Sequence, residues 1–169
     1  MILMTGGSKS GKSSYALLKA ADYKKRAFIA TAEAFDDEMK DRIQKHQIER
    51  SLEYTTYEEP IEVISCLKKI GNMYDVIILD CVTVWIGNLL YRFDGDTEKI
   101  NQYYDELLSI STEITSELII VTNEVGMGIV PDNPLSRKFR DLAGMLNQKL
   151  AVIADEAYLL VSGIPMKIK

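Results

Sequence analysis

The sequence lacks an apolar run long enough to cross a membrane, and it begins without the basic and apolar segments of an export signal. It also lacks an excess of basic residues, because 20 lysines and arginines face 25 aspartates and glutamates, giving a formal net charge of −5. Proteins that bind nucleic acid need a positive surplus to neutralise phosphates, so no nucleic-acid partner is expected. These absences predict a protein of the reducing cytoplasm with no membrane span.

Cysteine and histidine are scarce in this chain. The two cysteines, Cys66 and Cys81, form no CxxC pair, so we expect no metal site and no required disulfide, and interpret both as small buried hydrophobes. His46 is the only histidine, so any chemistry that needs an imidazole falls to this residue.

Short apolar runs alternate with longer amphipathic segments along the 169 residues, of which 47% are apolar. The runs predict strands at residues 2–4, 27–30, 76–79, 118–121 and 158–161, with a last short strand at 166–168. The amphipathic segments predict helices at about 12–21, 36–51, 60–70, 97–116 and 135–150, and residues 91–96 are expected to form a surface loop. This alternation indicates βαβ units in one α/β domain, residues 1–169, with a mainly parallel sheet flanked by helices.

The segment GGSKSGKSS, residues 6–14, stands between the first predicted strand and the first predicted helix. It matches the GxxxxGK[ST] pattern of a P-loop, in which glycines let backbone N–H groups point at phosphates and a helix N-terminus adds its dipole. Lys12 is expected to reach the β- and γ-phosphates, and the Ser13 hydroxyl to bind Mg²⁺. The predicted nucleotide contacts in this loop are Gly6, Gly7, Ser8, Lys9, Ser10, Gly11, Lys12 and Ser13.

A second candidate for Mg²⁺ is Asp80, which ends the apolar run VIILD at residues 76–80. The carboxyl ends of parallel strands share one edge of the sheet, so Asp80 is expected beside the P-loop. Taken alone, an aspartate after an apolar run is also an ordinary strand-to-loop turn. The chain is therefore expected to be a P-loop NTPase, but it lacks the NKxD motif of a GTPase switch, and the loop does not define the reaction.

His46 lies in the segment DDEMKDRIQKHQIER, residues 36–50, which has the pattern of a helix capped by Asp36. Helical spacing places His46 and Arg50 on one stripe, where Arg50 can bind a phosphate beside the imidazole. An imidazole can attack phosphorus as a nucleophile, or it can be a histidine without chemical duty. The periodicity does not decide between these two interpretations.

Several longer blocks of the sequence resemble one enzyme family nearly end to end. They are TGGSKSGKS (5–13), IATAEAFDDEM (29–39), RIQKHQIER (42–50), TNEVGMGIVP (122–131) and the C-terminal block 139–169. The chain resembles the bifunctional adenosylcobinamide kinase/adenosylcobinamide-phosphate guanylyltransferases of cobalamin biosynthesis, which have a RecA-like P-loop fold. We therefore expect it to phosphorylate the aminopropanol hydroxyl of adenosylcobinamide with ATP or GTP. It is then expected to transfer GMP from GTP to that phosphate, giving adenosylcobinamide-GDP and pyrophosphate.

The resemblance also implies particular residues. The transfer passes through a guanylylated histidine in this family, which makes His46 and Lys12 the expected catalytic residues, and relatives form homotrimers. Glu58 is expected to accept hydrogen bonds from guanine. Beyond the P-loop, the implied nucleotide contacts are Thr31, Ala32, Glu33, Gln47, Ile48, Glu49, Arg50, Glu58 and Asp80. Asp80 and Ser13 are the implied Mg²⁺ ligands.

The chain departs from the family pattern in places. Tyr54 stands where tryptophan is common and is expected to keep a platform for base stacking, and Lys45 precedes His46 where two histidines can occur. Residues 122–131 are expected to form a glycine-broken loop, while Arg137 and Arg140 face either a phosphate, a neighbouring subunit or solvent. Two rival functions remain: a plain small-molecule kinase with a structural His46, and a RecA-like nucleotide-binding subunit. No residue is assigned as the general base of the kinase step.

Overall fold

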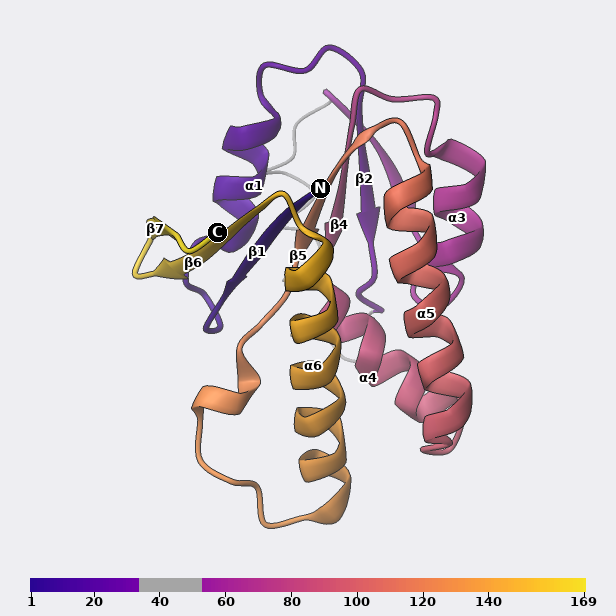
Figure 1. Cartoon of the computed structure of the whole chain (residues 1–169), viewed down its shortest axis with the longest axis vertical. Helices are drawn as coiled ribbons and strands as arrows, with labels where there is room; N and C mark the ends of the chain where they lie inside the picture. Colours follow the sequence, from indigo (N-terminus) through magenta and orange to yellow (C-terminus); the bar gives the residue numbers. More distant parts are fainter. Residues whose placement is uncertain (34–52) are drawn as a thin grey trace.

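The computed structural model describes residues 1–33 and 53–169, so the helix predicted for residues 36–51 lies outside the described residues (Figure 1). Seven strands form one sheet in the order β3-β2-β4-β5-β1-β6-β7. Their bounds are β1 (Ile2–Gly6), β2 (Arg26–Ala30), β3 (Tyr54–Glu58), β4 (Val76–Asp80), β5 (Glu117–Val121), β6 (Glu156–Val161) and β7 (Ile164–Lys167). Every neighbouring pair is parallel except β6 and β7, which confirms the predicted mainly parallel sheet.

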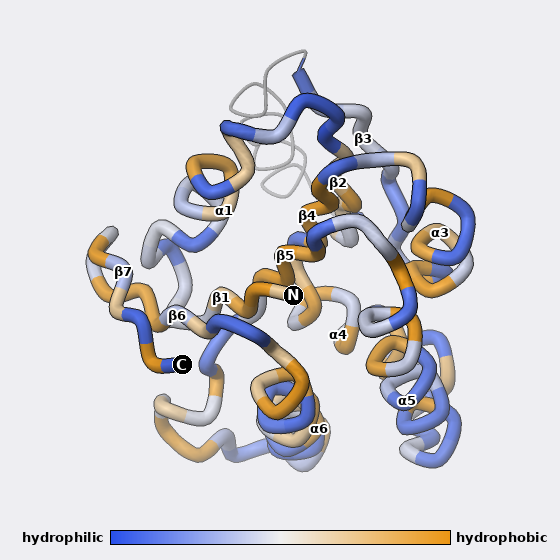
Figure 2. The backbone as a smooth tube through the Cα atoms, turned by 45° about the horizontal axis from the view of Figure 1, so that its top comes forward, coloured by the Kyte–Doolittle hydropathy of each residue, from blue (hydrophilic) through white to orange (hydrophobic). Residues whose placement is uncertain are grey.

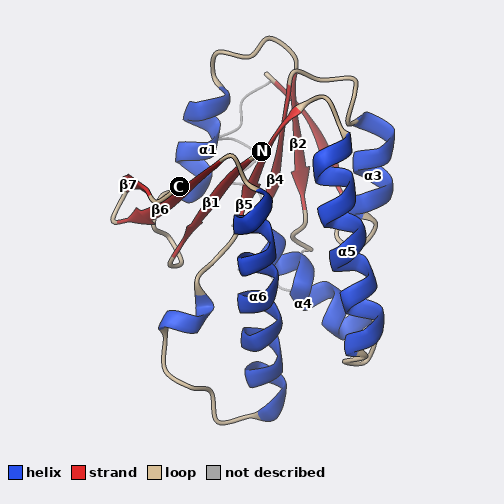
Figure 3. Cartoon of the chain, in the orientation of Figure 1, coloured by secondary structure: helices blue, strands red, loops and turns tan. Residues whose placement is uncertain are grey.

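Helices cover both faces of the sheet (Figure 3). Their bounds are α1 (Lys12–Ala20), α3 (Val63–Ile70), α4 (Val82–Arg92), α5 (Thr97–Glu113) and α6 (Pro134–Ile153), with the short 3₁₀ helix η1 (Val125–Met127) before α6. Alternate strand residues belong to two separate apolar clusters, one with α1 and the other with α3, α4, α5 and α6. Figure 2 shows α1 and α6 on opposite sides of the sheet. The central strands are apolar throughout because both of their faces are covered.

Two elements were missed by the sequence prediction. The strand β3 carries mostly polar side chains (Tyr-Thr-Thr-Tyr-Glu) because it is the edge strand, so it has no continuous apolar run. The helix α4 is rich in β-branched residues, yet it buries Trp85, Ile86 and Leu89 against the sheet. The predicted loop at residues 91–96 is therefore wrong at its start, because α4 continues to Arg92.

The strand order puts a topological switch point, where ligands of such sheets bind, next to the P-loop strand. The chain leaves β1 into α1 on one face of the sheet and leaves β5 into α6 on the other. Because β1 and β5 are neighbours, their following loops separate to opposite faces. Ligands of open α/β sheets bind at such a switch point, at the carboxyl ends of the strands.

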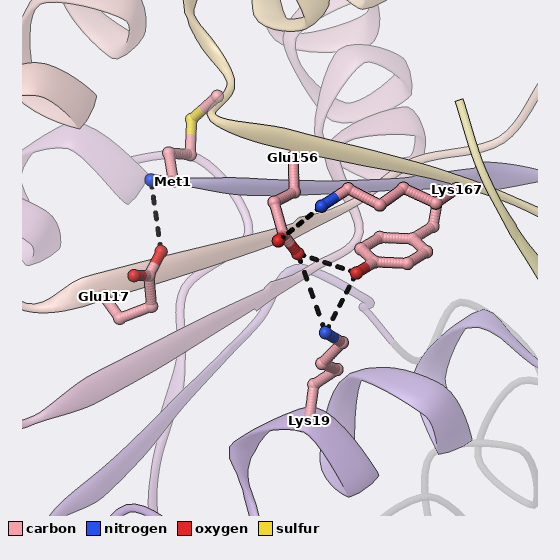
Figure 4. Close-up of polar contacts among 6 residues, drawn as sticks. Met1, Lys19, Glu117, Glu156 and Lys167 are labelled. Carbon is pink, nitrogen blue, oxygen red and sulfur yellow. Dashed lines mark hydrogen bonds and ion pairs between the residues drawn. The ribbon is translucent and has the colours of Figure 1, made fainter. Parts of the chain in front are cut away.

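The opposite, amino edge of the sheet carries a cluster of paired charges (Figure 4). Glu156 bonds Lys167 at 2.6 Å and the Tyr158 hydroxyl at 2.7 Å, and Lys19 of α1 lies 3.6 Å from the same carboxylate. These contacts, the bond to Lys167 above all, lower the pKa of Glu156 to about 2. The cluster ties α1 to β6 and to the C-terminal hairpin of β6 and β7.

Candidate active site

The P-loop joins β1 to α1 in a conformation that requires glycine at both of its conserved pattern positions. Gly6 has φ 146°, and a Cβ there would lie 2.4 Å from the Leu160 carbonyl oxygen. Gly11 has φ 95° and is the N-cap of α1, so any other residue would be strained. The loop therefore delivers Lys12 and Ser13 to the first turn of α1, as the motif predicts.

The Lys12 side chain is folded into the P-loop and is only 7% exposed. Its Nζ donates to the Gly7 carbonyl at 2.5 Å and to the Ser10 Oγ at 3.4 Å. Burial lowers the pKa of Lys12, while the nearby Cys81 and Asp80 act in the opposite direction. Because burial raises the pKa of the Cys81 thiol to about 12, that thiol is neutral at pH 7. Asp80 ends β4 at the carboxyl edge of the sheet, the edge at which β1 leads into the P-loop, so Lys12 and this predicted Mg²⁺ ligand lie at one edge.

The turn between β6 and β7 supports the P-loop from the side. The Gly163 amide donates to the Ser10 carbonyl at 2.9 Å. A Cβ at Gly11 would lie 3.1 Å from the Gly163 Cα, so the two backbones pack closely. The sequence did not indicate this contact, because residues 11 and 163 come from opposite ends of the chain.

Sheet register brings the predicted residues of β2, β3 and β4 to one edge. Ala30 pairs with both Glu58 and Asp80, so the segment 31–33 continues past the same line. Thr31 is fully buried, and its hydroxyl accepts from the Cys81 amide at 2.9 Å and donates to the Cys81 carbonyl at 2.8 Å. Thr31 thus holds the turn that follows Asp80, a role that its sequence position did not predict.

The structure describes only some of the predicted site residues. It brings the P-loop, Thr31, Ala32, Glu33, Glu58 and Asp80 to the carboxyl edge of the sheet. His46 and its neighbours Gln47, Ile48, Glu49 and Arg50 lie outside the described residues. The contacts of both groups with a nucleotide stay predictions.

The stacking role expected for Tyr54 is wrong. Tyr54 begins β3 and pairs with Arg26, the first residue of β2, so it lies at the amino edge rather than beside Glu58. Its ring packs edge-on against Phe28 at 6.3 Å and carries the Arg26 guanidinium at 5.3 Å. Tyr54 therefore contributes to the packing of the sheet.

Other predicted features have defined places. Arg137 donates to the carbonyls of Pro131 and Asp132 at 3.0 and 2.6 Å, so it folds back on the loop before α6. Arg140 pairs with Asp141 at 3.2 Å. Cys66 and Cys81 are both free thiols, and Cys81 caps α4 by accepting from the Val84 amide.

A buried polar network that the sequence analysis missed follows β5. The Thr122 hydroxyl donates to Asn147 Oδ1 at 2.7 Å, and Thr83 lies 3.1 Å from the same hydroxyl. Asn147 in turn donates to Glu124 at 3.0 Å. Beside this network is a cavity of about 560 Å³ between α4 and α6, lined by Thr83, Val84, Gly87, Asn88, Tyr91 and Phe139. The signal in the sequence was the polar segment TNE directly after an apolar strand.

None of the helices in residues 1–33 and 53–169 is long and apolar enough to span a membrane. The same ranges hold no group of three or more His, Cys, Asp or Glu side chains placed to bind a metal ion. The cytoplasmic location stays a prediction.

Comparisons with known proteins show which family the chain resembles. The family described as "Cobinamide kinase / cobinamide phosphate guanyltransferase" matches residues 2–168. Curated relatives include the "Bifunctional adenosylcobalamin biosynthesis protein CobU" of Escherichia coli (39% identical) and of Salmonella typhimurium (40% identical), each over 100% of this chain and 99% of the relative. The corresponding CobP protein of Pseudomonas aeruginosa is 36% identical over 99% of this chain and 96% of its own length.

A solved structure shares the fold. It is an ATPase from the type III secretion system of pathogenic bacteria, with a TM-score of 0.51 and 11% identity, covering 95% of this chain and 50% of the other. At this identity the likeness speaks for the fold alone. Together with the parallel sheet and the P-loop after β1, it confirms the predicted RecA-like P-loop NTPase fold.

Proposed function

The chain belongs to the cobinamide kinase / cobinamide phosphate guanyltransferase family, and we propose that His46 carries the guanylyl group between its two substrates. The protein is thus a bifunctional enzyme of cobalamin biosynthesis, a cobinamide kinase and a cobinamide phosphate guanylyltransferase. The proposal for His46 is supported by its being the only histidine of the chain.

In the proposed transfer, a ring nitrogen of neutral His46 attacks the α-phosphorus of GTP. The bond from that phosphorus to the oxygen bridging to the β-phosphate breaks, and pyrophosphate leaves. A phosphate oxygen of adenosylcobinamide phosphate then attacks the same phosphorus, the nitrogen–phosphorus bond breaks, and His46 returns to its neutral form. The covalent intermediate lets two bulky substrates use one nucleotide site in turn.

The P-loop supplies electrostatic stabilisation in both reactions. Lys12 is desolvated, and a desolvated cation stabilises developing phosphate charge more strongly than a hydrated one. The Lys12 Nζ, which bonds the Gly7 carbonyl, is proposed to turn to the β- and γ-phosphates when a nucleotide binds. ATP or GTP is proposed as the phosphoryl donor, and GTP as the guanylyl donor.

The residues at the edge also fit Mg²⁺. Ser13 and Asp80 offer oxygen donors, and Asp80 ends β4 at the carboxyl edge of the sheet, where β1 leads into the P-loop. Mg²⁺ is usually held by one or two protein oxygens together with substrate phosphates and waters, so a larger cluster of acids is not needed. When bound, the ion neutralises charge on the triphosphate.

Recognition of the base is proposed for the outer strands. Glu58 ends β3 at the carboxyl edge and is exposed, and its two oxygens match the N1–H and N2–H₂ donors of guanine. The remaining proposed nucleotide contacts are residues 31–33 together with Gln47, Ile48, Glu49 and Arg50. Inosine triphosphate, which lacks the N2 amine, is therefore expected to be a weaker guanylyl donor than GTP.

A homotrimer is proposed because the family that the chain resembles forms homotrimers. The segment between β5 and α6 exposes three apolar side chains, Met127 (78%), Ile129 (95%) and Val130 (60%). An exposed apolar group of this kind is typical of a surface that binds another protein or a large ligand. Sedimentation of the purified protein gives the number of subunits directly.

Labelled GTP tests the role of His46. Wild-type protein incubated with Mg²⁺ and GTP labelled at the α-phosphorus is expected to retain the label after denaturation, in a bond that is stable to base and lost in acid. GTP labelled at the γ-phosphorus should leave no label. His46→Ala should abolish retention, whereas Lys45→Ala, the neighbouring control, should keep it.

The rival functions give different results in the same experiment. A plain kinase with a structural His46 retains neither label. A RecA-like nucleotide-binding subunit releases phosphate without a corrinoid acceptor. If His46→Ala still converts adenosylcobinamide phosphate to adenosylcobinamide-GDP, the proposed intermediate is wrong.

A further inference from the structure

The two reactions of this enzyme differ in one chemical requirement. Phosphorylation of cobinamide joins the phosphoryl group to a hydroxyl, which must lose its proton, and proton removal by a positioned base is what general-base catalysis provides. The guanylyl transfer uses a phosphate as acceptor, which is already ionised at neutral pH. A base is therefore needed in one reaction and not in the other. We propose that Glu124 is the general base of the kinase reaction.

Glu124 lies at the switch point between β5 and β1, beside the P-loop. It follows β5, and its amide donates to the carbonyl oxygen of Gly6, the first residue of the P-loop motif, at 3.1 Å. The loops after β1 and β5 leave to opposite faces of the sheet, so the space between them is where a ligand enters. This position puts the Glu124 side chain next to the segment that holds the triphosphate.

In the part of the chain that the structure describes, the Glu124 carboxylate is held through a single oxygen. The Thr5 hydroxyl donates to Oε1 at 2.8 Å, and the Asn147 amide donates to the same oxygen at 3.0 Å. Both donors are neutral, and the ion pairs found among residues 1–33 and 53–169 do not include Glu124. A carboxylate has about four acceptor positions, so Oε2 keeps the capacity to receive a proton.

The orientation of Asn147 is itself fixed by the polar network. Its Oδ1 accepts from the Thr122 hydroxyl at 2.7 Å, and its Nδ2 also donates to the Asn123 carbonyl at 3.1 Å. Thr122 and Asn147 are buried, so these bonds are protected from water. A buried network whose members are all bonded is rigid, which is what holding a catalytic base requires.

Other acids at the edge stand farther from the P-loop strand. β5 is the immediate neighbour of β1, whereas the strands that precede Asp80, Glu33 and Glu58 lie successively farther away in the order β4, β2, β3. Asp80 is already proposed as a Mg²⁺ ligand. On the other side of β1, the turn after β6 contains Ser162 and Gly163 and no acid. Glu124 is thus the acid that follows the strand directly beside the P-loop strand.

The proton balance of the step is simple. As the hydroxyl oxygen of adenosylcobinamide attacks the γ-phosphorus, its proton passes to Glu124 Oε2. The bond from the γ-phosphorus to the oxygen bridging to the β-phosphate breaks, and the nucleoside diphosphate leaves. Glu124 then returns its proton to solvent. The inference rests on the kinase activity of the family and does not depend on the proposed role of His46.

Glu124→Gln tests the proposal within one molecule. The glutamine Oε1 can accept the same bonds from Thr5 and Asn147, so the fold is expected to survive. Nucleoside diphosphate formation with adenosylcobinamide and pyrophosphate release with adenosylcobinamide phosphate are measured separately. We expect the kcat of the kinase reaction to fall by about 10²–10⁴-fold with little change in the KM of the nucleotide. The ratio of kinase to transfer rate should fall by a similar factor.

Two further variants complete the test. Glu124→Asp keeps a carboxylate and should retain more kinase activity than Glu124→Gln. Glu106→Gln is the matched control, because this glutamate lies on α5 and pairs with exposed Lys68 at 3.2 Å. This variant should leave both rates unchanged. Equal losses of both reactions in Glu124→Gln would show a role in the fold and overturn the proposal, and so would an undiminished kinase rate. Neither result depends on whether His46 is guanylylated.

Discussion

Glu156 and Glu124, two acids at opposite edges of the sheet, have different kinds of bonding partner. At the amino edge, Glu156 is surrounded by Lys19 and Lys167, and the Met1 amino group lies 3.1 Å from Glu117. At the carboxyl edge, Glu124 is bonded by the neutral groups of Thr5 and Asn147. Lys12, which lies at the same edge, donates to the Gly7 carbonyl rather than to a carboxylate.

This difference separates structure from chemistry. Acids that are paired with cations have satisfied their charge and tie segments of the chain together. Acids and cations that are bonded only to neutral groups keep their charge for a ligand, at some cost in stability. Variants at the amino edge should therefore change stability and spare activity, and variants at the carboxyl edge should do the reverse.

The largest expected effect is that of Lys12→Ala. Both reactions need charge stabilisation on the triphosphate, so each rate should fall by at least about 10²-fold. The melting temperature should not fall, because burial already disfavours the charged form of Lys12 and lowers its pKa. Initial rates and thermal unfolding measure the two quantities. Lys19→Ala is the matched control on the same helix, and it should lower the melting temperature while sparing both rates. A reversed pattern in this pair would break the comparison of the two edges.

A smaller effect is expected from Gly11→Ala. At φ 95° an alanine costs about 1–2 kcal/mol, and its Cβ would lie 3.1 Å from the Gly163 Cα. The unfolding free energy should decrease by that amount, and nucleotide affinity should fall because the P-loop must shift, as equilibrium titration would show. Gly126→Ala is the control, because a Cβ at Gly126 meets nothing within 4 Å. Similar behaviour of the two variants would contradict the close packing of the hairpin on the P-loop.

The smallest effect is a pH dependence at the amino edge. The pKa of Glu156 is about 2 in the folded protein, below its ordinary value of 4.5. Its contacts therefore stabilise the fold fully above about pH 4.5, and this contribution is lost as the pH falls toward 2. Glu156→Gln should show a melting temperature that depends less on pH in this window than the wild-type value does. The proposal for Glu156 fails if the two proteins lose stability in parallel, and both enzymatic rates at neutral pH should be unaffected.

The buried strands and the P-loop could be predicted from the sequence because their signals are local. A strand covered on both faces must be apolar throughout, and a phosphate loop needs glycine at Gly6 and Gly11. The edge strand β3 and the helix α4 were missed because their local signals do not match the structure that they adopt. The polar residues of β3 and the β-branched residues of α4 follow local preferences that tertiary packing overrides.

The residues of the carboxyl-edge site also differ in whether a local sequence signal identifies them. The sequence motif and the family resemblance identified Lys12, Ser13 and Asp80, and all three lie at the carboxyl edge of the sheet. The role expected of Tyr54 came from the family resemblance alone, and β3 places this residue at the opposite end of the strand from Glu58. Glu124 was not singled out, because its segment, residues 122–131, was interpreted only as a glycine-broken loop.

What the sequence alone determined is the chemistry available to this protein: a phosphate loop, a lone histidine and acids at strand ends. Tertiary structure decided which of those groups meet. Because β5 enters the sheet beside β1, a side chain more than a hundred positions along the chain stands against the P-loop, and because the final hairpin folds back, Gly163 packs on Gly11. Strand order is a long-range property set by how the helices cover the two faces, and no local pattern of residues contains it.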